Sequence, residues 1–221
     1  MFAAIFKIIK RGIYLFVVLS ILSVILFRFL PVPITPLMLI RSGEYLIEGN
    51  PLILKYKWIS EESISDNLKK AVVAAEDQKF YLHHGFDIEA IKKAAKNNEK
   101  GKKIKGGSTI SQQCAKNVFL WQGRNWLRKG LEVYFTVLIE LFWSKERIIE
   151  VYLNVIEMGI GVYGAEAASE YYFKKSASAL TKSEAALLAS ILPNPRKWNV
   201  KNPSGYIQKR QRWILRQMRN L

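Results

Sequence analysis

The amino-acid sequence predicts a mainly α-helical protein with one transmembrane helix at its N-terminus. Three observations carry this prediction. An uncharged apolar run fills residues 12–27, helical spacing of apolar residues recurs from about residue 60 onward, and no apolar–polar alternation runs long enough to build a sheet. The 221 residues suit one anchor and a single globular domain.

The apolar run (GIYLFVVLSILSVILF) nearly spans a hydrocarbon core of ~30 Å, at roughly 1.5 Å per residue. A cleaved signal peptide would need small residues after the run, and the FRFLPVPITP that follows offers no such site. We therefore expect residues 1–30 to be a retained anchor, in preference to a signal peptide or a buried core helix. Three basic residues precede the run and predict a cytoplasmic N-terminus: Lys7, Lys10 and Arg11.

The rest of the chain divides into three parts. Prolines at positions 31, 33 and 36 mark a stiff linker, and residues 31–57 are expected to be an irregular or partly extended approach segment. A helical globular domain is expected over 58–200. Residues 201–221 are predicted to form a basic helix, which suits an anionic membrane surface.

Caps and apolar spacing predict the helices of the globular domain. A serine cap at 60, 63 or 65 would open the first helix, Asp87 caps the second, and Thr181 with Glu184 forms a capping box. The predicted helices cover residues 65–80, 87–97, 128–143, 145–159, 165–173 and 181–192.

The charge balance points to an anionic partner. The formal net charge is +16, from 34 basic and 18 acidic residues. Nucleic acid, anionic lipid headgroups and a phosphorylated substrate all fit that charge. The lysine-rich stretch at 92–105 is either a solvated, mobile loop or a loop facing anionic lipid or substrate. One cysteine and two histidines allow no internal disulfide and argue against a structural zinc site.

Two glutamates are candidates for chemistry. Glu76 ends an apolar helix and precedes Phe80, so partial desolvation is expected to raise its pKa, as a general base requires. Taken alone, it is better explained as an ordinary surface acid at a helix end, because Asp and Glu are usually exposed. Glu132 sits on a helix that is apolar nearly all round, so its carboxylate is either paired with Arg128 or functional.

A polar segment and a basic cluster lie between these glutamates. GGSTISQQCAKN (106–117) is too polar for a core helix and offers hydroxyls and amides that match sugar hydroxyls. It lacks the spacing of a Walker motif. The basic residues provide fixed positive charge, which a transferase with a diphosphate leaving group needs more than a glycoside hydrolase does. They are Lys116, Arg124, Arg128 and Lys129.

Five ordered stretches resemble the motifs of glycosyltransferase family 51, the peptidoglycan glycosyltransferases. The resemblance covers roughly residues 58–200. Few residues follow the fifth motif, so the chain resembles the monofunctional members and is expected to lack a transpeptidase domain. The stretches are EDQKFYLHHGFD (76–87), GGSTISQQCAKN (106–117), RKGLE (128–132), KERIIEVYLN (145–154) and AALLASILPNP (185–195).

The resemblance implies a lysozyme-like helical domain with a small, mobile, membrane-facing lobe. It implies polymerisation of lipid II into β-1,4-linked glycan with inversion, where Glu76 takes the proton from the acceptor's 4-hydroxyl. Glu132 would lie near the donor diphosphate, either holding a divalent cation (Mg²⁺ or Mn²⁺) or positioning cationic groups; no cofactor is certain.

The resemblance assigns the remaining candidates to two roles. The basic cluster matches or adjoins the phosphate-binding positions. Sugar binding falls to Ser108, Thr109, Gln112 and Gln113. Residues that match the first motif and shape its loop are Asp77, Phe80, His83 and Gly85.

The expected partners are lipid II, the growing lipid-linked strand and the bilayer, with other cell-wall synthesis proteins as further candidates and no nucleic acid. The expected location is the bacterial inner membrane, single-pass, with the catalytic domain in the periplasm. Two alternatives stay open: a lysozyme-like peptidoglycan hydrolase, and a basic membrane-anchored protein that binds nucleic acid.

Overall fold

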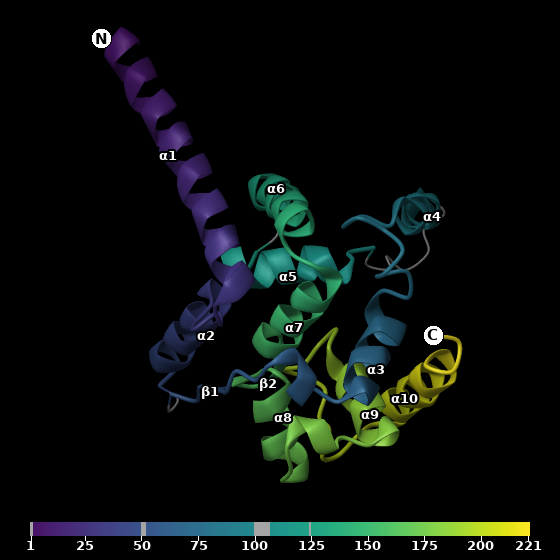
Figure 1. Cartoon of the computed structure of the whole chain (residues 1–221). Coiled ribbons are helices and arrows are strands. Elements are labelled where there is room, and N and C mark those ends of the chain that lie inside the picture. The colour runs from purple at the N-terminus through teal and green to yellow at the C-terminus, as the bar shows by residue number, and fades with distance from the viewer. Residues whose placement is uncertain (1, 50–51, 100–106, 124) are drawn as a thin grey trace.

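The computed structural model describes residues 2–49, 52–99, 107–123 and 125–221 (Figure 1). The mainly helical fold class is confirmed. The helices are α1 (Phe2–Phe29), α2 (Pro36–Ile47), α3 (Asp66–Glu76), α4 (Ile88–Glu99), α5 (Ile110–Phe119), α6 (Trp126–Phe142), α7 (Lys145–Val155), α8 (Ala165–Phe173), α9 (Lys182–Ile191) and α10 (Gly205–Gln217). Three parts of the predictions lie outside the described residues: Arg124, residues 100–105 of the lysine-rich stretch, and Gly106 of the polar segment.

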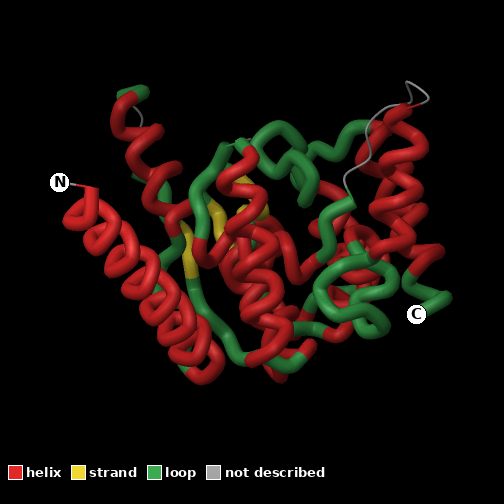
Figure 2. Tube along the Cα trace, turned by 90° about the horizontal axis from the view of Figure 1, so that it is seen from above, coloured by secondary structure: helices red, strands yellow, loops and turns green. Residues whose placement is uncertain are grey.

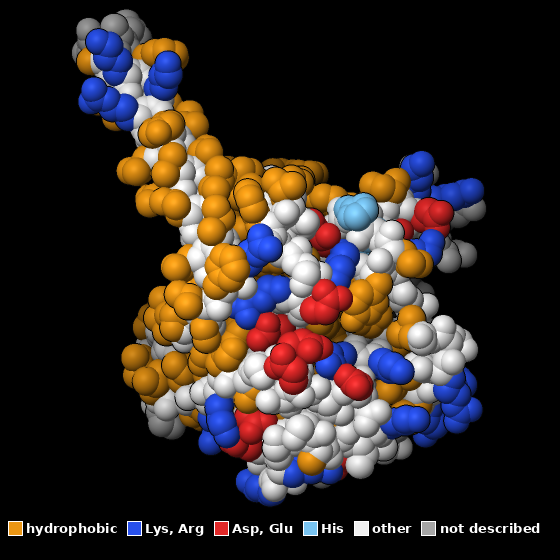
Figure 3. Space-filling model, viewed as in Figure 1, with side chains coloured by type: hydrophobic (Ala, Val, Ile, Leu, Met, Phe, Trp, Pro, Cys, Tyr) orange, Lys and Arg blue, Asp and Glu red, His pale blue; other side chains and the backbone are white. Residues whose placement is uncertain are grey.

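Helix α1 projects away from the body of the protein (Figure 1). Its span Ala4–Phe29 contains an 18-residue window with a mean hydropathy of 2.3, and the helix is long and apolar enough to cross a membrane. Figure 3 shows apolar side chains along this helix and along the neighbouring edge of the body, where α6 lies. The exposed apolar residues of α6 are Trp126, Leu127, Val133, Val137 and Leu141.

The C-terminal half of α1 is fastened to the body. Ser20 Oγ lies 2.6 Å from Tyr134 Oη of α6, and Phe16 packs against the Tyr134 ring. Trp143 Nε1 donates to the carbonyl oxygen of Val24 at 2.8 Å. These contacts fix the direction in which the anchor leaves the domain.

The expectation of an irregular approach segment is wrong for residues 36–47, which form α2. Thr35 caps this helix by accepting a hydrogen bond from Met38 N at 3.3 Å. Pro36 occupies the first helical position, where its missing N–H costs no hydrogen bond. The proline that was expected to block a helix therefore begins one.

The expectation that no sheet forms is also wrong. Strands β1 (Lys55–Tyr56), β2 (Glu157–Gly159) and β3 (Val162–Tyr163) make a small sheet in the order β1-β3-β2, with β1 parallel and β2 antiparallel to β3. Strands of two or three residues are too short for alternation to reveal. Figure 2 shows the strand residues lying among the helices.

Two groups of helices form the core. Helix α3 packs against α9 and α10, and α5 packs against α6 and α7. Capping side chains set where these helices begin, since each accepts a hydrogen bond from a first-turn amide. The caps are Ser65 for α3, Thr109 for α5, Asn125 for α6, Ser144 for α7, Thr181 for α9 and Ser204 for α10. The predicted Thr181–Glu184 capping box is present.

Candidate active site

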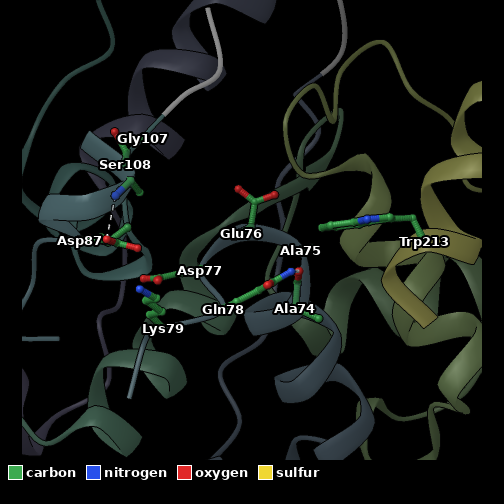
Figure 4. Close-up of a pocket in the computed structure, with 12 residues that line it drawn as sticks. Ala74, Ala75, Glu76, Asp77, Gln78, Lys79, Asp87, Gly107, Ser108 and Trp213 are labelled. Atoms are coloured by element: carbon green, nitrogen blue, oxygen red, sulfur yellow. Dashed lines mark hydrogen bonds between the residues drawn. The ribbon is translucent and has the colours of Figure 1, made fainter. Parts of the chain in front are cut away.

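Glu76 is the last residue of α3 and lines a pocket of about 290 Å³. Its side chain is 13% exposed, so the carboxylate is largely removed from water yet borders an open space. Figure 4 shows Glu76 between Trp213 on one side and Ser108 with Asp87 on the other. The pocket lining thus joins α3, α10 and the residues that lead into α5.

Both oxygens of the Glu76 carboxylate accept hydrogen bonds. Gln113 Nε2 donates to Oε2, and the Arg210 guanidinium donates to Oε1, each at 3.1 Å. Burial raises the pKa of Glu76, and Gln113, Arg210 and Lys116 partly oppose that rise. A carboxylate with a raised pKa is a stronger proton acceptor once ionised, which is the property that a general base needs.

Gln113 is itself oriented by Tyr152 of α7. The Tyr152 hydroxyl donates to Gln113 Oε1 at 3.1 Å, which turns the amide nitrogen of Gln113 toward Glu76. Tyr152 is fully buried. The carboxylate is therefore held through a chain of side chains that runs from α7 through α5 to α3.

The turn after Glu76 is held by Asp77. Its buried carboxylate lies 3.0 Å from His83 Nε2 and accepts a hydrogen bond from the backbone N–H of Ile110, also at 3.0 Å. Phe80 is fully buried, and the Lys145 ammonium lies 4.6 Å from the centre of its ring. These contacts join the first motif to the start of α5 and to the start of α7.

The structure leaves no room for a side chain at position 85, which glycine occupies. Its φ is +84°, and a Cβ there would lie 2.9 Å from Thr136 Cγ2 and 3.0 Å from Glu140 Cγ. The Gly85 carbonyl oxygen accepts from Thr109 Oγ1 at 2.6 Å. The turn consequently packs directly against α6.

The four residues predicted to bind sugar divide into two pairs. Thr109 and Gln112 are buried and form the capping box of α5, so their polar atoms already have partners. Ser108 lines the pocket, and Gln113 reaches Glu76. Gln113 thus reaches the carboxylate, Ser108 and Thr109 border the same pocket, and Thr109 with Gln112 builds the helix end.

The second glutamate lies in a cluster of positive charge. Glu132 is 3% exposed and accepts from Arg128 Nη1 at 2.8 Å and from Lys129 Nζ at 2.5 Å. Burial lowers the pKa of Lys116 on α5, and the charges of Arg128 and Lys129 lower it further. Glu132 and Glu76 both oppose this fall, so the Lys116 ammonium lies within electrostatic range of both carboxylates.

The donor set does not favour a divalent cation at Glu132. Each of its oxygens already accepts a hydrogen bond from a cationic side chain. Among the described residues, no three His, Cys, Asp or Glu side chains gather to hold a metal. Positioning cationic groups is the role that the contacts of Glu132 fit.

Three residues of the site were missed by sequence reasoning. The sequence did not single out Tyr152, and Arg210 and Trp213 lie in the segment 201–221, which was predicted only as a basic helix. Ile207 and Ile214 are seven residues apart, which places both on one face of a helix, and both are buried. This apolar spacing is the sequence signal that α10 packs into the domain. Arg210 lies between these two residues in sequence and follows Ile207 by three positions, which places it beside the packed face.

Comparison with known proteins identifies the family. The sequence model described as transglycosylase matches residues 52–219, which includes α10. Proteins called biosynthetic peptidoglycan transglycosylase are similar over most of the chain. One from Pseudomonas putida (strain W619) is 52% identical over all of this chain and 94% of its own length. One from Bacteroides thetaiotaomicron is 56% identical over 90% of this chain and 80% of its own length.

A third such protein, from Pasteurella multocida, is 51% identical over 95% of this chain and 87% of its own length. The family match covers most of the chain and all the motifs that carry the resemblance. The chain therefore belongs to the transglycosylase family, and its recognition as a peptidoglycan glycosyltransferase is confirmed.

Proposed function

We propose that this protein polymerises lipid II into β-1,4-linked glycan strands and releases the polyprenyl diphosphate carrier. One observation carries the proposal: a buried carboxylate with a raised pKa, Glu76, borders a pocket within electrostatic range of a cationic cluster. That pairing suits the deprotonation of a sugar hydroxyl at one point and the stabilisation of a diphosphate at another.

Glu76 is the general base in this proposal. Its carboxylate takes the proton from the 4-hydroxyl of the acceptor while that oxygen attacks the anomeric carbon of the donor. The C–O bond to the diphosphate breaks on the opposite face, so the configuration inverts and the diphosphate leaves with the bonding electron pair. The fixed position of Glu76 between Gln113 and Arg210 supports this role, because a base must be held within reach of its proton.

The diphosphate is bound by the cationic cluster of Lys116, Arg128 and Lys129. Charge-assisted hydrogen bonds from ammonium and guanidinium groups are the strongest contacts available to phosphate oxygens. Glu132 holds Arg128 and Lys129 in place, which keeps their charges fixed before the substrate arrives. Arg124 remains a further candidate for this cluster from the sequence alone.

Sugar recognition falls to Ser108 and Gln113, supported from behind by Thr109 and Gln112. The first-motif residues Asp77, Phe80, His83 and Gly85 shape the turn that presents Glu76. Their contacts with one another and with α5 and α6 support that division of roles.

The enzyme is proposed to be anchored in the inner membrane through α1, with a cytoplasmic N-terminus and a periplasmic catalytic domain. The three basic residues before the apolar run support this orientation. The apolar residues exposed on α6 beside α1 support close approach of the site to the bilayer, where a lipid-linked substrate resides.

The test is incubation of the full-length protein in detergent micelles with purified lipid II. Glycan chains that grow with time, and that lysozyme digests, are the expected product. Cleavage of finished strands without polymerisation of lipid II would replace this proposal with the hydrolase alternative.

A further inference from the structure

The C-terminal helix contributes a positive charge to the site, carried by a residue that follows Glu76 by 134 positions in the sequence. Arg210 of α10 lies 3.1 Å, Nη2 to Oε1, from Glu76 at the end of α3. Side-chain exposures of 21% for Arg210 and 13% for Glu76 show that this is a largely buried ion pair. A buried pair is screened far less than a surface pair, so its charge acts strongly on the carboxylate.

Packing of α10 holds the guanidinium in this position. Ile207 and Ile214 of this helix are buried against the domain, and the Gln211 amide donates to the carbonyl oxygen of Ser183 at 2.8 Å. Helix α10 packs on both α9 and α3. The arginine is thus carried on a helix that is itself fastened to the helix bearing Glu76.

Burying the Arg210 guanidinium costs desolvation free energy that its hydrogen bonds offset only in part. Its Nε is buried and has no hydrogen-bond partner among the described residues. An arginine on a basic helix could extend its side chain into water instead. Retention of a partly unsatisfied guanidinium against Glu76 indicates that the contact serves the carboxylate.

The charged and titratable groups around Glu76 shift its pKa in opposite directions. Asp77 raises the pKa of Glu76, whereas Arg210 from α10 and Lys116 from α5 lower it. Tyr152 from α7 reaches the carboxylate through Gln113. Burial is the largest influence and favours the protonated form, which cannot accept a proton. The hydrogen bond from Gln113 and, after it, the charge of Arg210 partly oppose that effect of burial.

From these contacts we propose that Arg210 is a positioning residue for Glu76, holding one carboxylate oxygen in place and keeping the group ionised in its buried setting. Gln113 holds the other oxygen, so the two donors together fix the rotation of the carboxylate. The same glutamate lines the pocket. This inference rests on the proposed role of Glu76 as the base.

The experiment measures the pH dependence of kcat/KM for lipid II polymerisation by the full-length protein. Arg210→Gln removes the charge and keeps a hydrogen-bond donor, while Arg210→Lys keeps the charge. The control is Arg212→Gln, an exposed arginine on the same helix. Thermal unfolding of all variants establishes that they are folded.

Loss of Arg210 raises the pKa of Glu76, so the rise of activity with pH moves to higher pH. We expect Arg210→Gln to shift this limb by about one unit, which is about tenfold lower activity below the limb and partial recovery above it. Arg210→Lys should shift it less, and Arg212→Gln not at all. A loss by the same factor at every pH, or an unchanged profile in Arg210→Gln, would overturn the inference.

A second measurement is independent of turnover. Carbon-13 NMR of labelled glutamate carboxyls, with Glu76→Gln to assign the signal, follows the titration of Glu76 directly. The midpoint should be higher in Arg210→Gln than in Arg212→Gln, and equal midpoints would refute the proposal. An active Glu76→Gln variant would instead refute the base assignment, so the two failures are distinguishable.

Discussion

The side-chain amide of Gln113 donates to Oε2 of Glu76 at 3.1 Å and so joins the polar segment of α5 to the end of α3. The same amide accepts from Tyr152, which leaves it one orientation that satisfies both neighbours. The base on α3 is thereby positioned by residues of two other helices, α5 and α7. Changes to this contact should alter catalysis with little effect on the surrounding core.

Gln113→Ala should reduce kcat by about ten- to hundredfold, because a hydrogen bond to a charged group contributes roughly 1.5–3 kcal/mol. It should also raise the pKa of Glu76, since Gln113 opposes the effect of burial. Tyr152→Phe removes only the outer hydroxyl and should cost less. Steady-state kinetics on lipid II compares the two, and a larger loss in Tyr152→Phe would contradict this order.

Glu132→Gln should impair both activity and stability. The substitution leaves Arg128, whose side chain is 11% exposed, beside Lys129 without a counter-charge. Breaking a buried pair in this way costs about 3 kcal/mol. Chemical denaturation measures the loss, with Glu170→Gln, a half-exposed partner of Lys57, as the control expected to change little. A Glu132→Gln protein of unchanged stability would argue that the pair is not tightly held.

Lys116 should set an alkaline limit on activity. Burial lowers its pKa below the usual 10.5, so its charge is lost at a lower pH than that of an exposed lysine. Because the ammonium is proposed to bind diphosphate, kcat/KM should fall as pH rises through this pKa. Lys116→Arg should move the fall to higher pH, whereas Lys116→Met should lose activity at every pH. An alkaline limb that Lys116→Arg leaves in place would assign it to another group.

Gly85→Ala should destabilise the protein by about 1–3 kcal/mol. The positive φ strains any side chain, and the new Cβ would meet Thr136 Cγ2 at 2.9 Å. Gly130→Ala is a useful control, because nothing lies within 4 Å of a Cβ there and alanine favours a helix. The two variants should therefore shift the melting temperature in opposite directions.

Much of the fold was predictable because its signals are local. The Thr181–Glu184 capping box, the apolar run of α1 and the caps at Ser65 and Asp87 each depend on residues close in sequence. Helix α2 was missed since three prolines were interpreted only as helix breakers, although proline also begins helices. The strands were missed because two or three residues show no period.

The site was predictable where one helix carries both partners. The pairing of Glu132 with Arg128 follows from their spacing of four residues. The pairing of Glu76 with Arg210 is set by the docking of α10, which local sequence does not encode. Long-range packing also gave Tyr152 its hydrogen bond to Gln113. Contacts of this kind can be identified only once the three-dimensional fold is known.

The most direct test of the central claim compares the intact protein with Glu76→Gln in a lipid II polymerisation assay. Circular dichroism and thermal unfolding establish that the variant is folded. The intact protein should convert lipid II into lysozyme-sensitive glycan chains, and Glu76→Gln should form none above background, because its amide cannot accept the proton of the 4-hydroxyl. Polymerisation by Glu76→Gln at the rate of the intact protein would contradict the account.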